Sequence, residues 1–134
     1  MLPANFRKAI LLGTVMWILL FVAAGVVMNS LGSGMIGIVL IFIGPIISIP
    51  IAYLYLKTTP NQDMFREGFK LGIIWAIWAF VLDLLIMVLI FGRGFAYYTS
   101  WTLWLGYCEM IGFSTLVGYL MIEKNNNVVR ARNG

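Results

Sequence analysis

Two acidic residues, Asp83 and Glu109, stand inside long apolar stretches of the chain. A charge deep in a bilayer costs about 2.5–3.5 kcal/mol, so an acid there is a candidate functional residue. The carboxyl can avoid this cost by taking up a proton, pairing with a cation, or sharing a proton or cation with a second carboxyl. We expect at least one of the pair to be protonated at neutral pH. A neutral acid that only hydrogen-bonds one helix to another is the structural alternative.

The elements that carry these acids are predicted to be transmembrane helices. The chain has 134 residues, of which 62% are hydrophobic and 10% charged, whereas soluble domains have about 45–50% and about 25%. A helix needs about 20 mostly apolar residues to cross a bilayer. Four stretches meet this length, at about residues 9–28, 35–56, 69–91 and 98–122. We therefore predict one all-α transmembrane domain over residues 1–134, with a mobile tail at about 124–134.

The two acids are predicted to lie at the same depth. Asp83 is eight residues before Phe91, near the end of the third stretch, and Glu109 is eight residues after Trp101, near the start of the fourth. In an antiparallel pair of helices these offsets place both carboxyls about 12 Å below one membrane boundary.

The basic residues predict an orientation in the membrane. Eight of the nine lie before the first stretch, in or beside the loop between the second and third, or after the fourth, and only Arg93 lies on the opposite side. Short loops rich in Lys and Arg stay in the cytoplasm, so we expect a cell-membrane protein with both termini cytoplasmic. Arg93 is then the available ion-pair partner for the two acids. Arg130 and Arg132 are expected to contact lipid headgroups and not nucleic acid.

The second apolar stretch contains two prolines, Pro45 and Pro50. Each proline removes the backbone donor that would bind the carbonyl four residues earlier, which favours a kink. The freed carbonyls could bind the hydroxyl of Ser48, a neighbouring helix or water. Either this is a broken helix that lines a cation or substrate site, or it is a kinked packing helix. We include Ser48 and Pro45 with Asp83, Glu109 and Arg93 in the candidate site.

Several kinds of chemistry lack their usual residues. The chain has no histidine and one cysteine, Cys108, so we expect no metal site, no cofactor and no redox pair. It also lacks a glycine-rich phosphate loop. An enzyme that acts on lipid through the acids, Tyr107 and Ser114 is a remaining alternative, but we expect no catalytic residues.

The apolar stretches contain packing faces and an internal similarity. Small residues that allow close helix approach recur at helical spacing: Gly72, Ala76 and Ala79 in the third stretch, and Gly106, Ser114 and Gly118 in the fourth. A shift of 59 positions aligns the first stretch with the third. It matches Phe6, Arg7, Leu12 and Gly13 with Phe65, Arg66, Leu71 and Gly72. This pattern predicts two duplicated α-hairpins packed as a bundle.

A basic residue followed by a glycine and a tryptophan occurs early in both the first and third stretches. The residues are Arg7, Gly13 and Trp17, and then Lys70, Gly72 and Trp75. In this pattern, which covers about half of the chain, the protein resembles uncharacterised small four-span membrane proteins of bacteria and archaea. The resemblance implies a four-helix fold and no particular activity.

These observations favour two functions. The first is a proton- or cation-coupled transporter or ion pathway that uses Asp83 and Glu109 and works as a homo-oligomer. The second is a non-catalytic accessory or assembly subunit of a larger membrane complex. Membrane lipids are expected partners in both cases.

Overall fold

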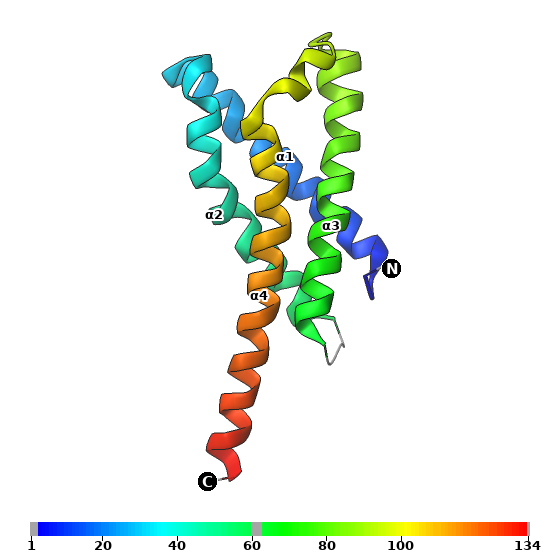
Figure 1. The fold of residues 1–134 in the computed structure, drawn as a ribbon, viewed down its shortest axis with the longest axis vertical. Coiled ribbons are helices and arrows are strands. Elements are labelled where there is room, and N and C mark those ends of the chain that lie inside the picture. The colour runs from blue at the N-terminus through cyan, green and yellow to red at the C-terminus, as the bar shows by residue number, and fades with distance from the viewer. Residues whose placement is uncertain (1–2, 60–62, 134) are drawn as a thin grey trace.

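A computed structural model of the chain describes residues 3–59 and 63–133. Four long helices form a bundle (Figure 1): α1 (Phe6–Leu31), α2 (Ile36–Lys57), α3 (Met64–Asp83) and α4 (Trp101–Asn133). Short helical segments join them: η1 (Ser33–Met35), the π-helical η2 (Leu84–Ile90) that continues α3, and the 3₁₀-helical η3 (Phe95–Thr99). The predicted all-α fold is confirmed.

Each of the four helices, with η2 included in the third, is long and apolar enough to cross a membrane. Only 17% to 28% of each apolar stretch is buried inside the bundle. Most of the apolar surface therefore faces outward, where lipid would cover it. The predicted four candidate spans are confirmed by length and composition.

The helices begin and end at different residues from those predicted. α1 and α3 start earlier because the side chains of Asn5 and Asp63 cap them, accepting hydrogen bonds from the backbone N–H groups of Lys8 and Arg66, each at 3.1 Å. α4 continues as an exposed helix through the predicted tail to Asn133. Whether this tail is mobile stays a prediction.

The two ends of the bundle differ. The connections from α1 to α2 and from α3 to α4 lie at one end, which we call the distal end, and the N-terminus and the end of α2 lie toward the other, the terminal end (Figure 1). α2 and α3 diverge toward the distal end, whereas α4 projects beyond the bundle at the terminal end (Figure 1). α3 packs most extensively against α4, and α4 also packs on α2.

α2 stays helical through both of its prolines, Pro45 and Pro50. The backbone is therefore not unwound as a broken helix would be. The Ser48 hydroxyl, one of the groups that could bind the freed carbonyls, forms no hydrogen bond with any described residue.

Three tryptophans join α1 to α3 through their indole N–H groups. Trp75 donates to the Ala9 carbonyl at 2.8 Å, Trp78 to the Thr14 hydroxyl at 2.9 Å, and Trp17 to an Asp83 carboxyl oxygen at 2.9 Å. The partners differ by 64 to 66 positions, whereas a two-fold axis relating duplicated hairpins would bring positions 59 apart to one level. The observed offset is five to seven residues larger, which is about 8–10 Å along a helix. The predicted duplication is thus not supported.

Small residues let α3 and α4 approach closely. A Cβ placed on Gly72 would come within 2.5 Å of the Ile111 Cα, and Cβ atoms on Gly68 and Gly118 would also collide with backbone of the facing helix. Gly72, Ser114 and Gly118 thus lie in a packing face, as predicted. Gly106 does not, because nothing lies within 4 Å of its Cβ position.

Candidate functional site

A cavity of about 660 Å³ lies between the four helices in the distal half of the bundle. Asp83, Glu109, Arg93 and Ser48 all line it. The structure therefore brings four of the five predicted site residues to one cavity. Pro45 is not a lining residue, although its neighbour Gly44 is. The exposed side chains of Arg93 and Trp101 also line the cavity, so it extends to the distal surface.

Asp83 is held by two helices other than its own. Its Oδ1 accepts the hydrogen bond from Trp17 Nε1 on α1 at 2.9 Å, and its Oδ2 accepts one from the Tyr107 hydroxyl on α4 at 2.5 Å. The Asp83 residue is 6% exposed. Both oxygens are thus used by fixed aromatic donors, and Asp83 links α1, α3 and α4.

The backbone changes at Asp83. α3 ends there and continues directly as the π-helical turns of η2, where the Phe91 N–H donates to the Ile86 carbonyl five residues earlier at 2.9 Å. Such π-helical turns occur often at functional sites because they shift the register of the side chains that follow. Here the shift begins immediately beyond the buried acid.

Tyr97 of η3 also lines the cavity. Burial raises the pKa of its hydroxyl, and the negative charge of Asp83 raises it further. Tyr97 therefore stays a neutral phenol, a group that can donate a hydrogen bond. The segment between η2 and α4 thus supplies a second aromatic hydroxyl, beside that of Tyr107, near the carboxylate.

Glu109 lies on α4 opposite α2, at the level of Gly44. A Cβ on Gly44 would be 2.9 Å from Glu109 Oε2. The carboxyl group of Glu109 therefore lies against α2 at a position where any residue larger than glycine would crowd it. Glu109 makes no hydrogen bond or ion pair with residues 3–59 or 63–133. The two predicted acids therefore line the same cavity, but only Asp83 is held by hydrogen bonds from other described residues.

Ser48 and Arg93 line the cavity without a hydrogen bond or ion pair to either acid in the described part of the chain. Ser48 is 3% exposed, and its hydroxyl is the buried side-chain oxygen that has no partner in the described part of the chain. Arg93, the available ion-pair partner, forms no ion pair with either acid within the described residues. Its exposed side chain stands at the distal end of the cavity.

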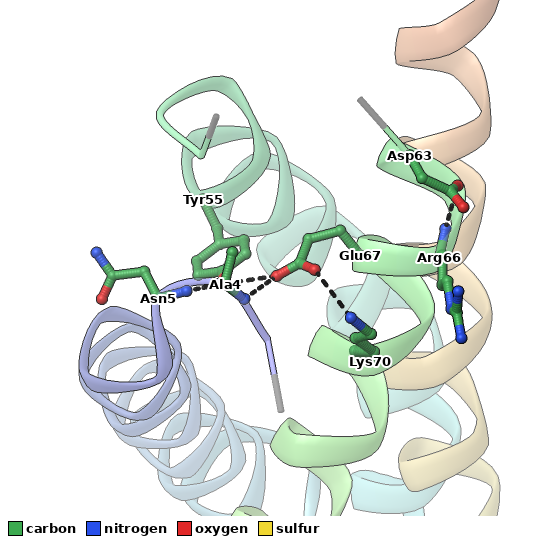
Figure 2. Close-up of polar contacts among 7 residues, drawn as sticks. All are labelled: Ala4, Asn5, Tyr55, Asp63, Arg66, Glu67 and Lys70. Atoms are coloured by element: carbon green, nitrogen blue, oxygen red, sulfur yellow. Dashed lines mark hydrogen bonds and ion pairs between the residues drawn. The ribbon is translucent and has the colours of Figure 1, made fainter. Parts of the chain in front are cut away.

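A second buried acid, Glu67, lies at the terminal end and was missed by sequence reasoning. Glu67 is 0% exposed, and its Oε1 accepts hydrogen bonds from the Ala4 N–H and, at 3.1 Å, from the Tyr55 hydroxyl (Figure 2). Tyr55 in turn accepts a hydrogen bond from the Asn5 N–H at 3.1 Å, and Lys70 forms an ion pair with Glu67 at 3.7 Å (Figure 2). This network ties the start of α1 to α2 and α3.

Sequence reasoning placed Glu67 in a basic loop, where an acid is normally solvated. The signal that could have found it is the tyrosine near the end of the preceding span, since a buried tyrosine hydroxyl needs a polar partner. Sequence reasoning named Trp17 only as part of a repeated pattern and Tyr107 only in the lipid-enzyme alternative, and it linked neither to Asp83. The indole N–H of Trp17 and the hydroxyl of Tyr107 connect these side chains to Asp83.

No group of three or more His, Cys, Asp or Glu residues within the described chain could hold a metal ion. No protein-family model, curated protein or solved structure matches the chain. The resemblance to small four-span proteins therefore rests on the quoted residues alone.

Proposed function

We propose that this chain is a small membrane transporter or ion pathway that binds protons or cations in the distal cavity. The observation that carries the proposal is the meeting of Asp83 and Glu109 in one cavity between spans. Carboxylates inside a membrane domain are costly unless they bind something. A cavity that holds two of them and extends to a surface suits cation entry.

The roles of the two acids follow from their contacts. Asp83 supplies fixed negative charge because Trp17 and Tyr107 hold both of its oxygens. Glu109 is the group that exchanges a proton or cation, because no described residue holds it. Arg93 at the distal end would repel cations from some approaches and bind anions, so it adjusts which ions enter.

The terminal half of the bundle is closed. Met16, Leu71 and Trp75 are each 0% or 1% exposed and form a packed layer beyond the cavity. Transport to the other side therefore requires this layer to open, as in alternating access. With the orientation favoured by the basic residues, the termini would be cytoplasmic and the cavity would face outward.

Flux through reconstituted protein tests this function. Purified protein in liposomes should carry protons or a monovalent cation down an imposed gradient, followed with an enclosed pH dye and with ion-selective dyes. Glu109→Gln should abolish the flux and Asp83→Asn should reduce it. Gly25→Ala is the matched control, because nothing lies within 4 Å of the Gly25 Cβ position. Unchanged flux in both acid variants would exclude the proposal.

One observation favours the second candidate, an accessory subunit of a membrane complex. The last turns of α4 project beyond the bundle and carry Lys124, Arg130 and Arg132 on an exposed helix (Figure 1). A helix without partners in its own chain is a suitable contact for another subunit. Gentle extraction from the native membrane should then recover a stable complex that deletion of residues 124–134 disrupts.

A further inference from the structure

The two acids of the cavity offer very different binding capacity to a ligand. Asp83 accepts one aromatic hydrogen bond on each oxygen, so its strongest acceptor positions are already used. Glu109 keeps both oxygens without a partner among the described residues. A ligand that needs a carboxylate would therefore find Glu109 free.

A second free acceptor lies beside Glu109. Ser48 follows Gly44 by four residues on α2, so the two share one helix face about 6 Å apart. The Gly44 position faces Glu109 Oε2, and both Gly44 and Ser48 line the cavity. The buried Ser48 hydroxyl has no hydrogen-bond partner among the described residues. Because buried polar groups are normally satisfied, this hydroxyl is available to hydrogen-bond a ligand in the cavity.

The rest of the cavity suits an organic cation better than a metal ion. Aromatic side chains line it, including Trp17, Phe21 and Trp101, and such faces attract cations. Its volume of about 660 Å³ falls within the range of small-molecule pockets, about 300–1,000 Å³. Divalent ions such as Ca²⁺ require about six to eight oxygen ligands, and the described residues include no cluster of three acidic or metal-binding side chains.

We infer that the cavity binds an organic ammonium group, whose N–H donors contact the Glu109 carboxylate and the Ser48 hydroxyl while its carbon skeleton packs on the aromatic lining. The inference rests on the proposed function and names its substrate class. Asp83 is then a positioning residue that orients Trp17 and Tyr107 and adds negative charge. Gly44 leaves room for the Glu109 carboxylate beside α2.

Binding of benzylammonium tests the inference. The protein is held in phosphatidylglycerol nanodiscs at pH 7, and binding is measured by isothermal titration calorimetry. Benzyl alcohol serves as the neutral analogue, and benzyltrimethylammonium as the cation without N–H donors. We expect the wild type to bind benzylammonium at least about tenfold more tightly than either analogue, since a charge-assisted hydrogen bond contributes this much.

Four variants locate the site. Glu109→Gln should weaken benzylammonium binding by about tenfold or more, and Ser48→Ala by several-fold. Gly44→Ala should also weaken it, because the added methyl group displaces the Glu109 carboxylate. Gly25→Ala, with open space around its Cβ position, should bind as the wild type does. Size-exclusion profiles and helical circular dichroism confirm that each variant is folded.

The outcomes separate this inference from the proposed function. Equal binding of benzyl alcohol, or unchanged affinity in folded Glu109→Gln and Gly44→Ala, overturns the ammonium site even if proton flux depends on Glu109. If proton flux is also unchanged in Glu109→Gln and Asp83→Asn, both the ammonium site and the proposed function are overturned. Adding phosphatidylethanolamine to the nanodiscs distinguishes the source of the ammonium: competition assigns the site to a lipid headgroup, and no competition assigns it to a free amine.

Discussion

The indole N–H of Trp17 and the hydroxyl of Tyr107 occupy the hydrogen-bond acceptors of Asp83. They hold its two oxygens from two different helices, so this acid is as much a structural link as a charge. Glu109, one residue beyond Cys108 on α4, lacks such donors among the described residues. The proposed function therefore gives these two acids separate roles, Asp83 as a fixed charge and Glu109 as the exchanging group.

Removing the Tyr107 hydroxyl tests the link at Asp83. Tyr107→Phe should lower the free energy of unfolding by about 1–2 kcal/mol, because it leaves one buried carboxylate oxygen unsatisfied. Unfolding in mixed micelles with increasing dodecyl sulfate measures the change. Tyr119→Phe is the matched control, since Tyr119 is exposed on the same helix. An equal effect of the two substitutions would contradict the link.

The Glu67 network gives a second prediction for single side chains. Glu67→Gln should destabilise the protein by about 1–3 kcal/mol because the ion pair with Lys70 is lost and the bonds from Ala4 and Tyr55 weaken. The N-terminal segment should then become easier to cleave. Limited proteolysis measures this, with the exposed Glu123→Gln as the control. Cleavage at the wild-type rate would show that Glu67 does not hold this segment.

Among the helices, the close contact of α3 with α4 holds the acids in register. Asp83 and Glu109 come from these two elements, and Gly72 lies where the two helices approach closely. Gly72→Ala should cost about 1–3 kcal/mol, because the new methyl group overlaps the Ile111 Cα and the Ser114 hydroxyl. Gly112→Ala, on α4 with open space at its Cβ position, should be neutral or slightly stabilising. Dodecyl sulfate unfolding compares the two, and equal stability would mean that the helices can separate without cost.

How much of these elements could be predicted depends on the range of the interaction. Hydropathy and length locate four spans because each is a property of about 20 consecutive residues. Equal offsets from Phe91 and Trp101 predict one depth for the two acids, because depth follows from position along a helix. Both acids line the cavity. The partners of Asp83 depend on how helices rotate and slide against each other, and no local pattern encodes that Trp17 reaches it from α1. Glu67 was missed because burial at a helix start depends on the N-terminal segment folding over it.

For the molecule as a whole, the bundle is tightly packed at the terminal end and open at the distal end. Trp75 and Leu71 fill the closed half, whereas the distal half contains the cavity with Asp83 and Glu109. An apolar exterior surrounds both halves. We propose that cations can enter this cavity, and that the two acids do not form a sealed packing contact between helices.

Thiol labelling at Gly106 tests that claim most directly. Gly106 lines the cavity and has open space at its Cβ position. In a Cys108→Ser background, Gly106→Cys should react with a trimethylammonium methanethiosulfonate faster than with the anionic sulfonate reagent, because Asp83 and Glu109 attract the cation. Gly112→Cys, exposed on α4 outside the cavity, should react with neither, because lipid covers it. No reaction at position 106, or no preference for the cationic reagent, would contradict a cation-accessible cavity.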